Sequence, residues 1–240
     1  MNLHAKRNRN TSCNQRLEMA VESLESREMM AGDVTVRVNG NAVTVIGSNE
    51  ADQIQITSSF GEVTVQATGD LGTTVNGQES FSTGLVSLER LTIRLRGGDD
   101  RISFRNTVVD GVTRISLGGS DTGGEIALNN GVELETLIIR GSSKSDIVTI
   151  GQPEIGEMKF NMGGGNDFVS ISAIAQLGDS HSIRMGSGED HVRVNSLPGS
   201  VSRLRLFGNG GNDLLSAVGE AFESASLEHR GFEEFITINA

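Results

Sequence analysis

The sequence predicts an all-β fold, a right-handed parallel β-solenoid of about eight coils with a repeat of about 23 residues. Three observations predict it. One layout recurs along the chain: an alternating apolar strand, a glycine-rich acidic turn, then Asp-x-apolar-x-apolar. The spacing between copies is nearly constant. Glycine is abundant and aromatic residues are scarce, with 31 Gly, no Trp and no Tyr among 240 residues. Such units bury a core by stacking on their neighbours.

The repeat is anchored on the first apolar residue after the acidic position of each turn. Successive anchors lie 24, 22, 21, 23 and 23 residues apart. They are Ile102, Ile126, Val148, Val169, Val192 and Leu215. An earlier copy, anchored at Ile54, lies two periods before Ile102, and a last copy is anchored at Ile236. The array therefore fills nearly everything after residue 33.

Each coil is expected to supply two short inward-facing strands across one tight turn. The apolar pairs that predict this are Ile93/Leu95 with Ile102/Phe104, Phe160/Met162 with Val169/Ile171, and Ile183/Met185 with Val192/Val194. Stacking in register places equivalent positions about 4.8 Å apart, the spacing between neighbouring strands. Residues 60–90 fit the repeat worst, and we expect either a hairpin-like cap or an irregular coil there.

Two segments make up the chain: residues 1–32 and a solenoid domain of residues 33–240. The first is expected to be a disordered basic arm followed by a short helix, with apolar residues at roughly helical spacing. Glu18, Glu22 and Glu25 interrupt every apolar stretch that an ordinary signal peptide would need. There is no run of 18 apolar residues, so no transmembrane segment is expected.

The charge of the chain is acidic and unevenly distributed. The formal net charge is −11, and residues 33–240 carry 15 basic against 27 acidic side chains. Such a body repels nucleic acid and anionic membranes and attracts cations, so no nucleic acid partner is expected. Cys13 is the only cysteine, which excludes an intrachain disulfide.

An acidic residue stands two positions before nearly every anchor. The set is Asp52, Asp100, Asp146, Asp167, Asp190 and Asp213, with Glu234 in the last copy and Gly124 in the copy that lacks one. Stacked carboxylates repel one another, so they must splay outward, become protonated, accept hydrogen bonds from backbone amides or hold a cation. Two interpretations stay open: a Ca²⁺ site built from carboxylate and carbonyl oxygens, or Asp side chains that cap their own turns.

Three of the turns carry a family resemblance. GGGNDFVSI, GSGEDHVRV and GNGGNDLLSA resemble the G-G-x-G-x-D-x-U-x nonapeptide of haemolysin-type, repeats-in-toxin calcium-binding proteins. The resemblance implies Ca²⁺ held between successive coils by the Asp side chain and the glycine-turn carbonyls. It departs from that family in having one such turn per coil of about 23 residues, and in placing Lys144 within GSSKSD. The implied metal residues are Gly163, Gly165, Asp167, Gly186, Gly188, Asp190, Gly208, Gly211 and Asp213, with Asp146 and Asp100 added from the same column.

A second resemblance covers the N-terminus. LESREMM resembles the LEPRxLL-type segment that opens many large secreted or surface proteins of planctomycetes, with Ser26 in place of Pro and Met29 and Met30 in place of the leucines. The strands AVTVIGSNEADQIQI and LERLTIRLRGGDDRISF also resemble the β-repeats attached to that segment. Together these features imply a secreted or cell-surface protein.

No catalytic motif accompanies the repeats. The histidines are His4, His181, His191 and His229. His181 and His191 fall on strand or turn positions without a nucleophile motif beside them, and they are expected to be exposed. The enzyme alternative is a β-helix polysaccharide lyase or hydrolase, or a glycan-binding module, acting on acidic or sulfated sugars. Its basic residues would be Arg94, Arg114, Arg140, Arg184 and Arg203. We expect these arginines instead to form salt-bridge ladders with the Asp columns.

The sequence therefore predicts a non-catalytic, extracellular or cell-surface structural or adhesive module that binds Ca²⁺ at its acidic turns. Expected partners besides Ca²⁺ are a surface polysaccharide or another surface protein. The end coils of a solenoid expose unpaired strand edges, so edge-to-edge self-association is a further expectation.

Overall fold

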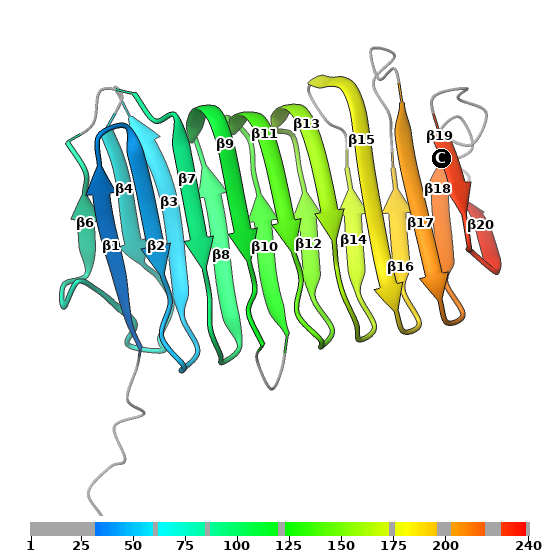
Figure 1. Ribbon diagram of the computed structural model, residues 1–240, viewed down its shortest axis with the longest axis horizontal. Coiled ribbons are helices and arrows are strands. Elements are labelled where there is room, and N and C mark those ends of the chain that lie inside the picture. The colour runs from blue at the N-terminus through cyan, green and yellow to red at the C-terminus, as the bar shows by residue number, and fades with distance from the viewer. Residues whose placement is uncertain are drawn as a thin grey trace, which may run out of the picture.

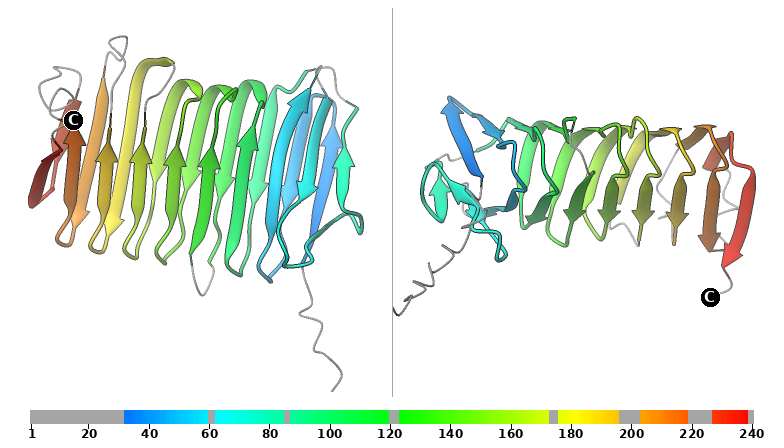
Figure 2. Two further views of the ribbon diagram at one scale, coloured as in Figure 1. Left: turned by 180° about the vertical axis from the view of Figure 1, so that it is seen from behind. Right: turned by 90° about the horizontal axis from the view of Figure 1, so that it is seen from below.

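The structure is a computed structural model. It describes residues 32–59, 62–84, 87–119, 123–172, 176–195, 203–218 and 227–238. These residues form strands, turns and loops without a helix, in a β-solenoid of two ten-stranded sheets. The strands lie side by side along one long axis, and the two sheets face each other across the core (Figures 1 and 2).

One sheet, called sheet B below, has the order β19-β17-β15-β13-β11-β9-β7-β2-β1-β5. Its strands are β1 (Asp33–Asn39), β2 (Ala42–Ile46), β5 (Thr74–Val75), β7 (Arg90–Arg94), β9 (Val108–Ser116), β11 (Glu133–Arg140), β13 (Glu154–Asn161), β15 (Gln176–Ser187), β17 (Leu204–Gly210) and β19 (Leu227–Arg230). From β2 to β19 all neighbours are parallel, because each coil returns the chain to the same edge.

The facing sheet, sheet C, has the order β20-β18-β16-β14-β12-β10-β8-β3-β4-β6. Its strands are β3 (Gln53–Ser59), β4 (Glu62–Ala67), β6 (Ser80–Ser82), β8 (Asp100–Arg105), β10 (Gly124–Leu128), β12 (Ile147–Ile150), β14 (Phe168–Ile171), β16 (His191–Val194), β18 (Leu214–Val218) and β20 (Glu234–Ile238). The acidic turns join β2 to β3, β7 to β8, β11 to β12, β13 to β14, β15 to β16 and β17 to β18.

The register confirms the predicted repeat. Ile102 pairs with Ile54 on one side and with Ile126 on the other, and the later anchors up to Leu215 follow in the same row. The last anchor is wrong by one residue, because Leu215 pairs with Phe235 and not with Ile236. The segment EEFITI has apolar residues at adjacent positions, so its alternation fits either register.

The predicted inward pairs form the core. Each of the pairs named from the sequence is buried, as are the anchors from Ile54 to Leu215. Full burial of an aliphatic or aromatic side chain contributes about 1.5–3 kcal/mol. Because every coil adds only a few such residues, the core is a thin continuous layer, and the stability of a coil depends on its neighbours.

The N-terminal end is closed by antiparallel strands. β1 pairs with β2, β3 with β4 and β4 with β6, all antiparallel, while β5 lies parallel to β1. The segment that fitted the repeat worst is therefore the hairpin-like cap. It explains the double period between Ile54 and Ile102, since the inserted hairpins lie beyond the first coil while β3 pairs directly with β8.

Some expectations are not confirmed. The structure supports about five turns with a spacing of about 23 residues, and the predicted eight coils are not confirmed. At the N-terminal end antiparallel strands take the place of coils, and along the solenoid several connections fall outside the described residues. The expected arm, helix and LEPRxLL-like segment also fall outside them. Within the described part, no helix is long and apolar enough to cross a membrane.

Candidate functional site

The acidic column lies inside the solenoid, along the edge where the sheet B strands turn into sheet C. Each of its Asp residues is at most 2% exposed. The members are Asp52, Asp100, Asp146, Asp167, Asp190 and Asp213. The carboxylates therefore do not splay outward into solvent, which was one of the outcomes expected for a stacked column.

These carboxylates form a ladder of hydrogen bonds between coils. The Asp167 Oδ1 atom accepts the Asp146 backbone N–H at 2.8 Å, and the Asp190 Oδ1 atom accepts the Asp167 N–H at 2.7 Å. The Asp213 Oδ1 atom continues the pattern at 3.0 Å from the Asp190 nitrogen. The Asp100 Oδ1 atom likewise accepts the Asp52 N–H at 2.9 Å. Each side chain thus binds the backbone of the preceding coil.

The ladder continues through its irregular positions. Gly124 has no carboxylate, but its N–H still donates to the Asp146 Oδ1 atom at 2.8 Å. At the C-terminal end, Glu233 accepts the Asp213 N–H at 2.7 Å through Oε2. The sequence prediction assigned this place to Glu234, an error that follows from the one-residue shift of the last anchor. We call this series of contacts from Asp52 to Glu233, which is interrupted at Gly124 because glycine has no side chain to accept the Asp100 N–H, the aspartate ladder.

In two coils a second set of bonds satisfies the carboxylate. The turns Gly47–Asp52 and Gly141–Asp146 share the pattern G-S-x-x-x-D. In the second, the Ser142 N–H donates to the Asp146 Oδ2 atom at 2.6 Å and the Ser142 hydroxyl lies 3.2 Å from Oδ1. Ser48 binds Asp52 in the same way, at 2.7 and 3.2 Å. In these turns the Asp caps its own turn, as one of the two interpretations expected.

The other turns leave one carboxylate oxygen without a partner. No serine stands four residues before the Asp in these turns; the residues in place of Gly-Ser are Leu95-Arg96, Met162-Gly163, Met185-Gly186 and Gly208-Asn209. Within the described residues, the unpartnered buried carboxylate oxygens are the Oδ2 atoms of Asp100, Asp167, Asp190 and Asp213. A buried unsatisfied acceptor costs about 1–3 kcal/mol, so these turns hold carboxylates less favourably than the Gly-Ser turns.

The electrostatics follow from burial. Burial raises the pKa of Asp167 to about 8 and that of Asp100 to about 7, against the hydrogen bonds from the preceding coil, which lower both. Neighbouring carboxylates raise these pKa values further. Burial also raises the pKa of Asp146, but there the hydrogen bonds from Ser142 and Gly124 oppose it. Removing a carboxylate from water disfavours its charged form, which explains the common direction.

The glycines of the turns are required by close approach between coils. A Cβ on Gly188 would lie 1.9 Å from the Gly165 carbonyl oxygen, and one on Gly211 would lie 1.6 Å from the Gly188 oxygen. Both glycines also have positive φ, 139° and 135°. Gly208 is needed for the same reason and for a second one, since its Cβ would lie 1.9 Å from the Gly231 carbonyl oxygen and 2.3 Å from the Asp213 Oδ2 atom. Glycine here lets the coils stack tightly around the aspartate ladder.

The predicted metal residues are brought together in one column, where the Oδ1 atom of each of the five predicted Asp residues accepts a hydrogen bond from the preceding coil. The Gly163 carbonyl accepts the Ser187 N–H, and the Gly210 carbonyl accepts the Gly188 N–H, each across coils. Among the described residues, no group of three or more His, Cys, Asp or Glu side chains is arranged to hold a metal ion. Oxygens free for a cation are found at the Oδ2 atoms described above.

His181 and His191 differ from the expectation of exposure. His181 is 1% exposed. Its Nδ1 atom accepts the Met158 N–H at 3.1 Å, and its Nε2 atom lies 3.0 Å from the Gly178 carbonyl oxygen, which fixes the neutral ring with its proton on Nε2. The Met158 amide follows a register shift between β13 and β15, so the ring supplies an acceptor where the bulge disturbs the backbone ladder. His191 is half-buried against Phe168 and Ser216, and burial lowers its pKa.

The arginines do not form salt bridges with the aspartate ladder, and that prediction is wrong. They point outward from sheet B, while the carboxylates lie inside the solenoid. The ion pairs found among the described residues are Arg101–Glu125, Lys159–Glu157, Arg203–Glu228 and Arg205–Glu228. An arginine near the end of a sheet B strand, such as Arg140, is thus on the outer side of the sheet. The Asp at the end of the following turn, such as Asp146, is on the inner side.

Comparison with known proteins gives no relative: no family model, no curated protein and no solved structure matches this chain.

Three residues have roles that were not predicted from the sequence. Ser48 and Ser142 complete the carboxylate shell in their turns, and the shared G-S-x-x-x-D pattern was the signal available for them. His181 had no comparable signal, because a bulge between parallel strands depends on the neighbouring coil.

Proposed function

We propose that the chain is a non-catalytic structural or adhesive module of an extracellular or cell-surface protein. In this proposal it is a right-handed coil of about eight turns, the hand that nearly all crossovers between parallel strands have. The observation that supports a structural role is the aspartate ladder. Its acidic side chains lie inside the stack and bind backbone amides, so they serve cohesion between coils.

The non-catalytic part of the proposal has a direct test. The purified chain is incubated with polygalacturonate and with sulfated polysaccharides, and the reducing ends and unsaturated products are measured. We expect no turnover above the level of the Asp167→Asn variant. Turnover by the unaltered chain that this variant lacks would contradict the proposal.

A second candidate is Ca²⁺ binding at the turns, with the resemblance to haemolysin-type repeats behind it. The observation that favours it is the row of unpartnered Oδ2 atoms on Asp100, Asp167, Asp190 and Asp213. Ca²⁺ prefers oxygen ligands of this type, and an ion that binds only the folded chain stabilises it by about 2.7 kcal/mol at one hundred times Kd.

Thermal unfolding with Ca²⁺, with Mg²⁺ and with a chelator tests this candidate. We expect Ca²⁺ to raise the midpoint, and Asp167→Asn to reduce that shift more than Asp99→Asn does. Asp99 is an exposed turn residue and serves as the matched control. Equal midpoints in Ca²⁺ and chelator would leave the carboxylates with the backbone-binding role alone.

A further inference from the structure

The outer face of sheet B carries an ordered set of basic side chains. Every strand from β7 to β19 on this sheet presents one at one of two neighbouring outward positions. We call the set the basic zigzag: Arg94, Arg114, Arg140, Lys159, Arg184, Arg205 and Arg230.

The strand register arranges these residues alternately in two rows. Arg94 pairs with Ser116, while Arg114 pairs with Thr92 and Ile138. Arg140 returns to the first row beside Ser116, and Lys159 to the second beside Ile138. The last members continue the alternation: Asn161 pairs with Arg184, Ser182 with Arg205, and Phe207 with Arg230. Diagonal neighbours of this kind are about 7–8 Å apart, so the cations are spread along the whole solenoid.

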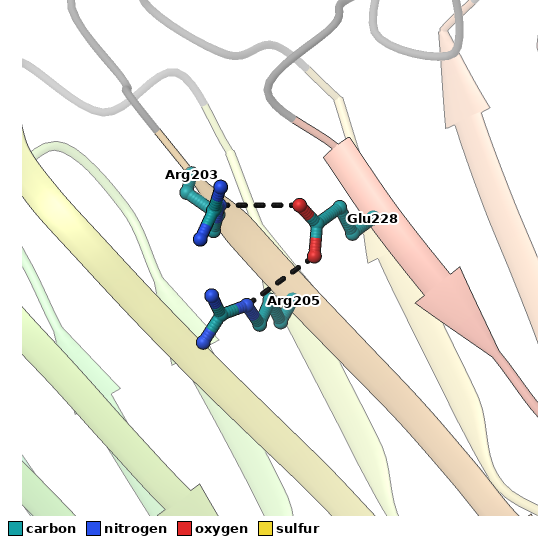
Figure 3. A network of polar contacts seen from close by, with 3 residues as sticks. All are labelled: Arg203, Arg205 and Glu228. Carbon is teal, nitrogen blue, oxygen red and sulfur yellow. Dashed lines mark hydrogen bonds and ion pairs between the residues drawn. The ribbon is translucent and has the colours of Figure 1, made fainter.

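Few acidic side chains form ion pairs with the basic zigzag. Lys159 pairs with Glu157 on its own strand at 2.8 Å. Near the C-terminal end, Arg203 and Arg205 both contact Glu228, at 3.1 and 3.3 Å (Figure 3). Among the described residues no ion pair is formed by Arg94, Arg114, Arg140 or Arg184, and each of the four is exposed. A chain with net charge −11 thus keeps a continuous basic track on one face.

The middle of the track is shaped to receive a chain of polar groups. A shallow groove is lined there by Arg140, Lys159, Arg184 and Arg205, with Ser180 and Ser182 between them, and its one acidic lining residue is Glu157, the ion-pair partner of Lys159. The short hydroxyl side chains leave room between the long basic ones and offer neutral hydrogen-bond partners. Arg184 is held over the Phe207 ring at 5.5 Å from its centroid, which restricts the guanidinium before any ligand arrives.

Acidic residues border the track and limit its width. The strands β9, β11 and β13 bend at one edge of the sheet (Figure 1). Acidic residues of these three strands lie in this part of the sheet. These are Asp110, Glu133, Glu135 and Glu154, which line a separate groove. At the opposite edge are the turns, with exposed Asp99 and Glu189. A ligand that fits is therefore narrow and runs along the solenoid axis.

We propose that the basic zigzag binds a linear polyanionic polysaccharide, one that carries sulfate esters or uronate carboxylates. Guanidinium groups bind sulfate and carboxylate oxygens in bidentate fashion, and the serine hydroxyls and Asn161 suit sugar hydroxyls. Nucleic acid fits less well: proteins that bind single strands stack the bases on aromatic side chains, and Phe207 is the one aromatic residue among the described outward positions of the track.

The test measures binding of dextran sulfate and of polygalacturonate by calorimetry at about 0.1 M salt, where the Debye length is about 10 Å. Uncharged dextran and a single-stranded oligothymidylate are the comparison probes. We expect one or both of the polyanionic glycans to bind, with weaker binding at higher salt, and neither comparison probe to bind as tightly. The glycan that binds more tightly identifies sulfate or carboxylate as the recognised group.

Matched variants locate the site. Arg140→Ser/Lys159→Ser/Arg184→Ser removes the centre of the basic zigzag, and Arg101→Ser/Arg105→Ser/Arg193→Ser removes the same charge from exposed positions on sheet C. We expect the first set to weaken glycan binding at least tenfold and the second less than threefold. Unchanged circular dichroism spectra show that both variants are folded. Equal losses in both, tighter binding of the oligonucleotide, or no binding of either glycan would overturn the proposal.

Discussion

The Asp167 carboxylate accepts the backbone N–H of Asp146, which lies one coil earlier, through a contact of 2.8 Å inside the solenoid. The same relationship recurs between successive coils with a fixed direction, from the amide of one coil to the carboxylate of the next. The turn edge of the solenoid is therefore held together by side chains as well as by the backbone pairs of the two sheets.

Removing one carboxylate should leave a buried amide without an acceptor. We expect Asp167→Ala to lower the free energy of unfolding by about 2–4 kcal/mol, because the Asp146 N–H loses its partner and a small cavity remains. Asp167→Asn keeps an acceptor at the same place and should cost less. Urea denaturation of both variants, with Asp99→Ala as the exposed control, measures the difference. Equal stability of all three would show that the contact contributes nothing.

The glycine requirement can be tested within a single turn. A Cβ on Gly211 would lie 1.6 Å from the Gly188 oxygen, and its φ is 135°. The adjacent Gly210 has no atom closer than 4.0 Å to an added Cβ and no positive φ. We expect Gly211→Ala to destabilise by about 2 kcal/mol or more, and Gly210→Ala by less than about 0.5 kcal/mol. Thermal unfolding midpoints of the two variants measure the difference. A lower midpoint for Gly210→Ala than for Gly211→Ala would contradict the close stacking of the coils at Gly211.

The raised pKa values predict how stability changes with pH. Asp100 and Asp167 have pKa values of about 7 and about 8 in the folded chain, above the ordinary value of 3.8. The folded chain therefore binds these protons more tightly than the unfolded chain. Their contribution to stability is full below the unfolded pKa and is lost as pH rises through about 7 to 8, with a slope of at most about 1.4 kcal/mol per pH unit for each proton.

Asp167→Asn should remove the contribution of Asp167 to the decrease of stability with pH, since an amide does not titrate. Denaturation measured from about pH 5.5 to 8.5 should show the unaltered chain losing stability relative to the variant as pH rises. A difference between the two that stays constant across this range, or changes in the opposite sense, would mean that the carboxylate is already ionised throughout.

His181 is expected to matter through its acceptor nitrogen. His181→Ala leaves the buried Met158 amide unpaired and removes a buried ring, so we expect a loss of about 2–4 kcal/mol. His191→Ala serves as the comparison, because that ring is half-buried and bonds a side-chain hydroxyl. A loss for His181→Ala no greater than for His191→Ala, measured by urea denaturation, would refute the role at the bulge.

Much of the fold was predictable because period and alternation are local properties. The spacing of Ile102, Val148 and Val169 fixed which residues stack, and the alternation within each strand fixed which face is buried. The prediction was wrong at Ile236, where adjacent Phe and Ile let two registers satisfy the alternation equally. The number of turns also depended on where hairpins replace coils, which period alone does not reveal.

The site was predicted in position and less well in role. The sequence indicated that the Asp residues form one column, but it did not indicate that their side chains lie inside the solenoid. Whether such a side chain points inward or outward depends on the geometry of a tight turn, which the spacing of residues does not reveal. In the turn that ends at Asp146, the carboxylate points inward and binds the amides of Ser142 and Gly124. The salt bridges expected between arginines and this column were wrong for the same reason, since strand positions such as Arg140 point to the other side of the sheet.

The most direct measurement of the aspartate ladder is residue-resolved amide hydrogen exchange in Asp190→Ala, Asp190→Asn and the unaltered chain. We predict that Asp190→Ala loses protection at the Asp167 amide, whose acceptor it removes, while the Asp146 amide stays protected by Asp167 and Asp190→Asn changes little. Unchanged protection of the Asp167 amide in Asp190→Ala, or equal loss at every turn, would contradict a ladder in which each carboxylate binds the coil before it.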